Sequence, residues 1–311
     1  SVEDEVITDD FVKMLKAKNV SVCPTLTVFP NYRKTFTQSL NYSNYELKNA
    51  NPTQLGSLYD LKHIPEQSMI NGLKSSMLEG QADFQKTDSI CLVNLKKMAD
   101  AGVRIVAGTD AGNIGTMHGT SLVDELITMK KSGMSQWEVL KSATINAAHF
   151  MSREKTTGSV TSGKLADMVL LDKNPLENLE HLRSISLVIN NGYVIKPDTL
   201  IKDTPEILAQ RQLNAYNARN LEAFLEPYAE DVEIYQFPDK LLSKGKEEMR
   251  KGYSFFNDLP DLHCEITSRI IQNNIVIDKE SVTGIGTPKP MEATAIYQAE
   301  NGKIKKVYFI E

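Results

Sequence analysis

An aspartate at the end of an apolar run is the residue of this sequence best suited to chemistry. Asp110 closes the run Arg104-Ile-Val-Ala-Gly-Thr, and His118 follows after a turn rich in glycine. Such a run is typical of a buried parallel strand that brings one carboxylate to the open rim of an α/β fold. There a carboxylate can bind a divalent metal ion and act as a general base toward water. The alternative is that Asp110 only caps the helix that follows it.

Alternating helices and strands are expected to position Asp110. The periodicity of apolar residues predicts a helix that begins after Thr8 and a helix over residues 66–101. Between them, residues 20–29 favour a short strand that Pro24 interrupts. A strand over residues 103–107 then leads directly to Asp110.

Two further helices are expected after Asp110. The first ends near Gly133, and a capping box formed by Ser135 and Glu138 begins the second. The apolar face of the first helix is expected to consist of Leu122, Val123, Leu126 and Met129.

Residues 30–65 are polar and aromatic, contain three prolines and show little periodicity. Connections of this length in a compact domain are usually functional or partly mobile. Two interpretations stay open: a lid over the site, or a helical insertion that covers the rest of the fold.

Composition limits the classes of partner. The net charge of -5 gives no electrostatic reason to expect nucleic acid or a membrane surface, and no apolar run of about 18 residues occurs. We therefore expect a small-molecule substrate. The three cysteines lack the spacing of a zinc site, so buried thiols are expected. Ser1 stands where a methionine is usual, and we expect the chain to begin inside a longer protein.

Three domains are predicted. A strand over residues 166–172 and a hairpin over 188–195 follow the α/β units, and residues 196–205 read as a linker. Beyond the linker, two helices precede several strands with asparagine-rich turns, which is an α+β pattern. The predicted boundaries are 1–157, 158–200 and 201–311.

Several motifs in the first 200 residues resemble, in order, the closing third of the metal-dependent amidohydrolases, in particular the imidazolonepropionase and prolidase-like branch. The motifs are Gly108-Thr-Asp-Ala-Gly112, His118-Gly-Thr-Ser-Leu-Val-Asp-Glu-Leu126, Glu138-Val-Leu-Lys-Ser-Ala-Thr-Ile-Asn-Ala-Ala148 and Gly163-Lys-Leu-Ala-Asp-Met-Val-Leu-Leu-Asp172. The resemblance implies the C-terminal part of a (β/α)8 barrel with a small flanking β-sandwich.

The resemblance also implies roles for individual residues. Asp110 would be the aspartate of the eighth barrel strand, which ligates the metal and takes a proton from the attacking water. His118 would lie in the loop above Asp110, in contact with the substrate or with residues that bind it. Thr25 is a further candidate for substrate contact. The implied cofactor is a divalent metal, zinc, in the full-length enzyme.

The sequence departs from the family pattern in its metal ligands. Complete members carry a His-x-His pair on the first strand, and this sequence has none. A catalytic zinc needs about three protein ligands, so we expect the chain to be catalytically incomplete and unable to hold the metal alone. The five histidines are His63, His118, His149, His181 and His263.

Residues 201–311 resemble the cone-shaped α+β fold of nuclear transport factor 2-like, ketosteroid isomerase-like and SnoaL-like proteins. The resemblance rests on residues 212–224, 228–234 and 302–309. Alternation places either Val276, Asp278, Glu280 and Val282 or the intervening residues on the inner face of a strand. An inward Asp278 or Glu280 could shuttle protons, whereas outward or cross-strand-bonded carboxylates would only be structural. Tyr235 and His263 are further pocket candidates.

Three functional hypotheses follow. The first is the C-terminal portion of an amidohydrolase that cleaves carbon–nitrogen bonds of cyclic amides, other non-peptide amides or dipeptides. The second is a metal-independent isomerase or cyclase within residues 201–311. The third is a ligand-binding or dimerisation module, since domains of this type often form homodimers through their sheets.

Overall fold

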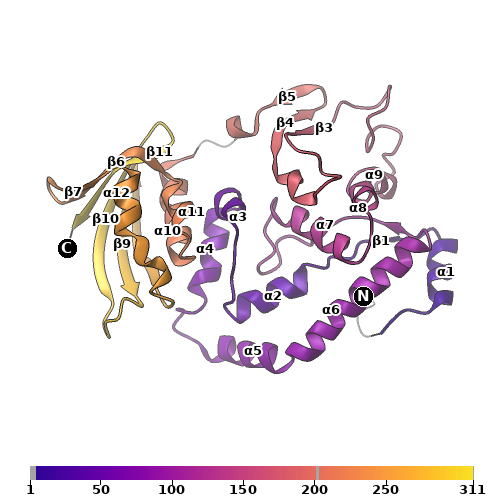
Figure 1. Cartoon of the computed structure of the whole chain (residues 1–311), viewed down its shortest axis with the longest axis horizontal. Coiled ribbons are helices and arrows are strands. Elements are labelled where there is room, and N and C mark those ends of the chain that lie inside the picture. The colour runs from indigo at the N-terminus through magenta and orange to yellow at the C-terminus, as the bar shows by residue number, and fades with distance from the viewer. Residues whose placement is uncertain (1–4, 201–202, 311) are drawn as a thin grey trace. The chain divides into compact units, whose positions relative to one another are not determined.

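The computed structural model describes residues 5–200 and 203–310, which form two compact units (Figure 1). The first unit comprises residues 5–39 and 68–200, and the second comprises residues 40–67 and 203–310. The expected α/β character of the first part and α+β character of the second are both confirmed. Throughout these described ranges, no helix has the length and apolar composition needed to cross a bilayer.

The first unit combines helices with two small sheets, and its apolar core lies between the helices and β2 (Arg104–Ile105). Its elements are α1 (Asp9–Ala17), β1 (Ser21–Val22), α2 (Val28–Phe36), α5 (Ser68–Glu79), α6 (Gln81–Asp100), β2 (Arg104–Ile105), α7 (Ser121–Lys131), α8 (Gln136–Ser142), α9 (Ile145–Phe150), β3 (Met168–Leu171), η1 (Leu179–Arg183), β4 (Ile185–Asn190), β5 (Tyr193–Ile195) and η2 (Pro197–Thr199). The helices α1, α6, α7 and α8 bury their apolar faces against β2. The predicted capping box of Ser135 and Glu138 is confirmed at the start of α8.

The strands β1 and β2 pair in parallel, with Ser21 opposite Arg104 and Val22 opposite Ile105. Both strands are shorter than the apolar runs that contain them. Pro24 has no backbone N–H to donate, which explains why β1 ends at Val22. Because the pair is parallel, the chain leaves both strands at the same rim.

A buried glutamate of α7 fixes the loop that follows β1. Glu125 is fully buried, and its carboxylate accepts hydrogen bonds from the backbone N–H groups of Leu26 (2.8 Å) and Thr27 (2.9 Å) and from the Thr27 hydroxyl (3.0 Å). Burial raises the pKa of Glu125, and these three donors oppose the rise. Leu122, expected on the buried face of α7, is instead 42% exposed.

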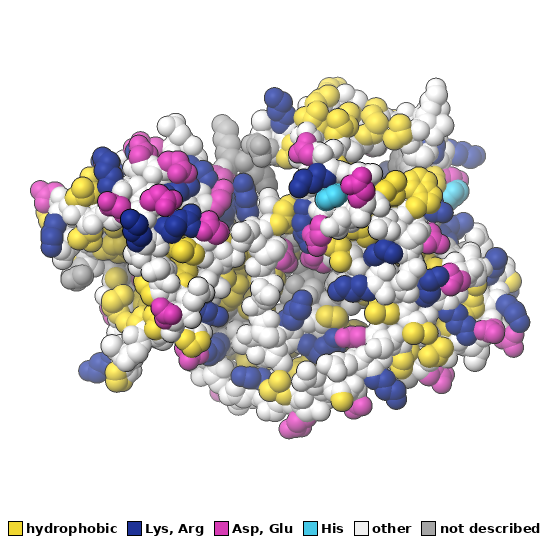
Figure 2. All heavy atoms as spheres, in the orientation of Figure 1, with side chains coloured by type: hydrophobic (Ala, Val, Ile, Leu, Met, Phe, Trp, Pro, Cys, Tyr) yellow, Lys and Arg dark blue, Asp and Glu magenta, His cyan; other side chains and the backbone are white. Residues whose placement is uncertain are grey.

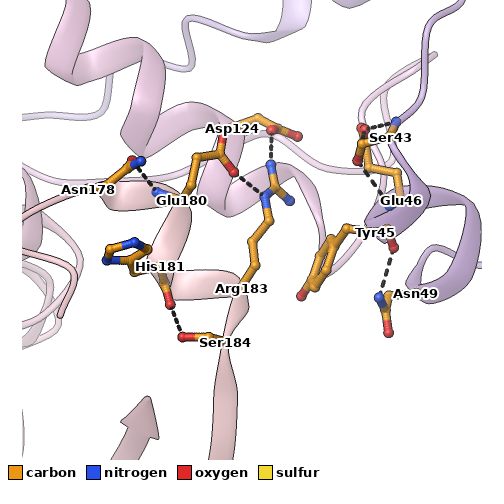
Figure 3. A network of polar contacts seen from close by, with 10 residues as sticks. All are labelled: Ser43, Tyr45, Glu46, Asn49, Asp124, Asn178, Glu180, His181, Arg183 and Ser184. Carbon is orange, nitrogen blue, oxygen red and sulfur yellow. Dashed lines mark hydrogen bonds and ion pairs between the residues drawn. The ribbon is translucent and has the colours of Figure 1, made fainter. Parts of the chain in front are cut away.

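The flanking sheet has the order β3-β4-β5 and is antiparallel. The predicted hairpin is confirmed, since Asn191 and Gly192 both adopt the positive φ that its two-residue turn requires. The helix η1 connects this sheet to α7, because Arg183 binds both Asp124 and Glu180 (Figure 3).

Both faces of the flanking sheet leave large apolar side chains exposed, and Figure 2 shows hydrophobic atoms gathered over this region. These side chains include Val169, Leu170, Ile185, Tyr193 and Val194. The edge strand β5 pairs only with β4. An apolar sheet with an open edge is prone to pair with a strand of another chain.

The second unit is a six-stranded sheet with helices against it (Figure 1). Its elements are α3 (Asn44–Asn49), α4 (Pro52–Asp60), α10 (Pro205–Asn217), α11 (Leu221–Leu225), β6 (Tyr228–Gln236), β7 (Lys240–Lys244), α12 (Lys246–Gly252), η3 (Ser254–Asn257), β8 (His263–Gln272), β9 (Ile275–Thr283), β10 (Met291–Glu300) and β11 (Lys303–Ile310). The sheet order is β7-β6-β11-β10-β9-β8, and β6 and β11 are its parallel pair. The elements β7 and α12 were not predicted.

Residues 40–67 pack against α10 and belong to the second unit. The close approach occurs at Gly56 of α4, where an added Cβ would lie 2.7 Å from side-chain atoms of Asn214 and Gln210. The side-chain amide of Asn214 also donates to the Pro52 carbonyl oxygen (2.7 Å). The Lys48 Nζ forms an ion pair with the Glu226 Oε1 at 3.3 Å.

The structure gives residues 30–65 the helical character of the second interpretation, since they contain α2, α3 and α4. The helices α3 and α4 do not join the first predicted domain, because their apolar residues Leu47, Leu55 and Leu58 are buried within the second unit.

Replacing the buried glutamate should weaken the first unit. In Glu125→Gln an amide NH2 group must face a backbone donor, which leaves a buried donor unsatisfied at a cost of about 1–3 kcal/mol. We expect the free energy of unfolding of the first unit to fall by that amount in chemical denaturation. The exposed Glu79→Gln is the matched control, and equal stability of both variants and the wild type would contradict the role of Glu125.

Charging the open edge of the flanking sheet should reduce self-association. Val194 of β5 is 64% exposed, so Val194→Lys should not disturb folding while it disfavours edge-to-edge pairing. We expect less concentration-dependent light scattering than for the wild type. Val160→Lys, at an 85% exposed loop position, is the control; an equal effect of both lysines would exclude the sheet edge as the cause.

Candidate functional site

Three predicted site residues follow the strands β1 and β2, which end at the same rim. Thr25 follows β1, whereas Asp110 follows β2 and is succeeded by His118. Thr25 (φ 47°) and Asp110 (φ 53°) both adopt left-handed backbone conformations. This is unusual for a β-branched residue, and such strain is concentrated at functional sites.

The Asp110 side chain is exposed at this rim. Its backbone carbonyl oxygen accepts hydrogen bonds from the backbone N–H (3.3 Å) and side-chain amide (3.0 Å) of Asn113. Its carboxylate has no hydrogen bond to any residue that the structure describes. Since α7 begins only at Ser121, with Thr120 as its N-cap, Asp110 does not cap that helix. The carboxylate is therefore free to meet a ligand.

His118 is also exposed, and its ring lies against the turn that follows Asp110. Its Nε2 is 3.4 Å from the position that a Cβ on Gly112 would take. The imidazole thus lies beside the glycine-rich turn, where it can donate or accept a hydrogen bond.

Cys23 is a rim residue that the sequence analysis missed. It was expected to be buried but is exposed, and only Cys264 of the three cysteines is buried. A Cβ on Gly108 would lie 2.5 Å from the Cys23 Sγ, so the glycine leaves space for the sulfur. Desolvation raises the pKa of the thiol, and the carboxylates of Glu125 and Asp110 add to the rise. The thiol is therefore held in its protonated form.

The described residues do not fit a metal centre by themselves. A catalytic zinc takes about three protein ligands. Within residues 5–200 and 203–310, no three His, Cys, Asp or Glu side chains are grouped so that they could hold an ion. Asp110 can supply one carboxylate ligand. His118 is the histidine closest to Asp110 in the sequence.

The second unit buries two carboxylates from one strand. Val276, Asp278, Glu280 and Val282 all point inward, which is the first of the two predicted alternations. The Asp278 carboxylate accepts two hydrogen bonds from Arg269 on the neighbouring strand, both at 2.7 Å. Asp278 is therefore fixed in a cross-strand ion pair.

Glu280 has a different environment. The Tyr297 hydroxyl donates to its carboxylate (2.7 Å), and Gln212 links Tyr297 to Tyr228 through bonds of 3.1 and 3.2 Å. Burial raises the pKa of Glu280 to about 7. This carboxyl group can exchange a proton near neutral pH, as a general acid or base must.

The two further pocket candidates of the second unit, Tyr235 and His263, have other surroundings than expected. Tyr235 is not a pocket residue: it lies on the opposite face of β6 from Val232 and Ile234, stacks on Tyr308 and donates to Glu233 (2.8 Å). His263 is buried and stacks on the His63 ring, with centroids 3.7 Å apart.

Comparisons with known proteins give separate matches for the N-terminal and C-terminal parts of the chain. Residues 209–307 match the model of the SnoaL-like domain. Imidazolonepropionase from Shouchella clausii is 35% identical over 127 residues, which cover 40% of this chain and 27% of that protein. The chain spans between 24 and 39% of the length of the curated relatives it matches.

Two solved structures are similar to separate parts of the chain. A Xaa-Pro dipeptidase with bound methionine is 19% identical, with a TM-score of 0.42. The similar region covers 61% of this chain and 38% of the dipeptidase. An uncharacterised cystatin-fold protein from Novosphingobium aromaticivorans covers 35% of this chain, with 98% of its own length, 26% identity and a TM-score of 0.32.

The model of the amidohydrolase family matches residues 41–197, which is half of the chain. These residues include Asp110, His118 and the helix that carries Glu125. The protein belongs to the amidohydrolase family.

Proposed function

We propose that the first unit forms part of the active site of a hydrolase that cleaves carbon–nitrogen bonds in small molecules, cyclic amides above all. The observation that carries this proposal is the exposed, unpaired carboxylate of Asp110 in the segment that follows β2, within the match to the amidohydrolase family. The names of the curated relatives support a cyclic amide of the imidazolone type.

Asp110 is proposed as the general base of this reaction. It takes a proton from the water that attacks the carbonyl carbon and returns it to the leaving nitrogen as the carbon–nitrogen bond breaks. His118 and Thr25 are proposed to orient the substrate. A metal in this site requires ligands beyond those of the described residues, with Asp110 contributing one oxygen.

Removing the proton acceptor should slow hydrolysis strongly without unfolding the protein. Asparagine tolerates the left-handed conformation of Asp110, so Asp110→Asn should fold normally. In the product of the complete gene, we expect kcat to fall by roughly 10²–10⁴ on a panel of cyclic amides, N-acyl amino acids and dipeptides.

The exposed carboxylate of Asp172 in the flanking region provides the control. Asp172→Asn should hydrolyse the panel at the wild-type rate. Wild-type turnover by Asp110→Asn, or no turnover of any panel member by the unaltered protein, would overturn the proposal.

A second candidate function is supported by Glu280. A buried carboxyl group with a pKa of about 7, hydrogen-bonded to a tyrosine, suits proton transfer in an isomerase or cyclase that needs no metal. Because Arg269 fixes Asp278 as an ion pair, Glu280 is the residue proposed to move the proton.

The raised pKa of Glu280 predicts a pH-dependent stability of the second unit. The folded-state pKa lies above the ordinary value of 4.5. The protonated carboxyl group therefore contributes fully to the free energy of unfolding below pH 4.5, and this contribution is lost as pH rises through about 7. The loss amounts to about 3 kcal/mol. We expect Glu280→Gln to flatten the dependence of the unfolding temperature on pH between 4.5 and 8. The exposed Glu265→Gln should retain the wild-type slope, and equal slopes for all three proteins would contradict the assignment.

A further inference from the structure

A hollow of about 360 Å³ lies wholly within the second unit, apart from the Glu280 network and the Asp110 rim. One wall comes from residues 40–42 and Tyr59 of α4. The opposite wall comes from the turn between α10 and α11 and from η3. The volume is that of a small-molecule site.

Tyr59 contributes a hydrogen-bond donor without a partner. Its side chain is only 9% exposed, and its hydroxyl makes no hydrogen bond among the residues that are described. Burial raises its pKa, so the hydroxyl keeps its proton. The ring of Tyr42 meets that of Tyr59 edge to face, with centroids 6.2 Å apart. A buried hydroxyl of this kind is costly unless a ligand satisfies it.

Arg219 contributes a positive charge to the same hollow. It has a φ of 54°, and its Nη1 reaches only the carbonyl oxygens of Asn217 and Leu262, both at 3.4 Å. No carboxylate in the described ranges forms an ion pair with Arg219. Its guanidinium is close enough to Tyr59 to oppose the rise in the tyrosine pKa.

The acidic groups near Arg219 have other partners. Glu222 of the hollow binds Arg250 through two hydrogen bonds, and Asp261 pairs with Lys62 at 3.0 Å. The hollow therefore presents a guanidinium and a hydroxyl donor, both suited to an anionic acceptor. The rest of the wall mixes apolar and aromatic side chains, Leu40, Leu221 and Phe256, with neutral polar ones, Asn41, Asn220, Ser254 and Asn257.

We propose that this hollow is a binding site for a small aryl carboxylate. The carboxylate accepts hydrogen bonds from Arg219 and Tyr59, and the ring lies against Phe256 and Tyr42. A ligand held in this way joins residues 40–59 to the α10–α11 turn and so stabilises the docking of the insertion within the second unit.

The test compares a charged probe with a neutral probe of the same shape. The chain of residues 1–311 is titrated with benzoate and with benzamide, and ligand-observed NMR gives the dissociation constants. We expect benzoate to bind about tenfold more tightly than benzamide, because only the carboxylate makes charge-assisted hydrogen bonds. Tyr59→Phe and Arg219→Gln should each weaken benzoate binding about tenfold.

Tyr59→Phe also separates a binding role from a structural one. Because the hydroxyl has no partner in the fold, the variant should unfold at the wild-type temperature or above it. Tyr235→Phe, on the outer face of β6, is the control and should bind benzoate as the wild type does. Equal affinity for benzoate and benzamide, wild-type binding by Tyr59→Phe, or a lowered unfolding temperature for that variant would overturn the proposal.

Discussion

The parallel pairing of β1 with β2 determines the geometry of the candidate active site. Two paired residues on each strand are enough to direct both segments of the chain to one rim. Beyond that rim, Thr25 and Asp110 adopt left-handed backbone conformations. The loop after β1 is fixed from behind by the buried carboxylate of Glu125. The position of the loop after β1 thus depends on one hydrogen-bonded side chain of α7.

The second unit shows how neighbouring inward positions of one strand acquire different chemistry. Asp278 and Glu280 differ by two residues and face the same interior. Arg269 pairs directly with Asp278, whereas the hydrogen-bond partner of Glu280 is the neutral hydroxyl of Tyr297, and the nearby Asp278 charge adds to the rise in the Glu280 pKa. The charge partner, and not burial alone, therefore separates a structural ion pair from a group that can titrate near neutral pH.

Local patterns in the sequence predicted the parts of the fold that depend on local physics. The strand before Asp110, the capping box at Ser135 and the Asn191-Gly192 hairpin follow from periodicity and turn chemistry. Glu125 was missed, although its four-residue spacing from Ser121 and Met129 places it on the buried stripe of α7. The docking of α4 on α10 could not be predicted, because it depends on a close approach at Gly56 between segments far apart in sequence.

That docking has a consequence for synthesis of the protein on the ribosome. The helices α3 and α4 are made more than a hundred residues before α10, against which they pack. At ordinary translation rates they wait roughly 8–30 s for this partner. During that interval Leu47, Leu55 and Leu58 have no native surface to cover them, so the nascent chain presents an apolar helical segment to chaperones. The second unit is consequently not encoded by the C-terminal part of the gene alone. A gene rearrangement that moved this part by itself would leave the apolar faces of α4 and α10 uncovered.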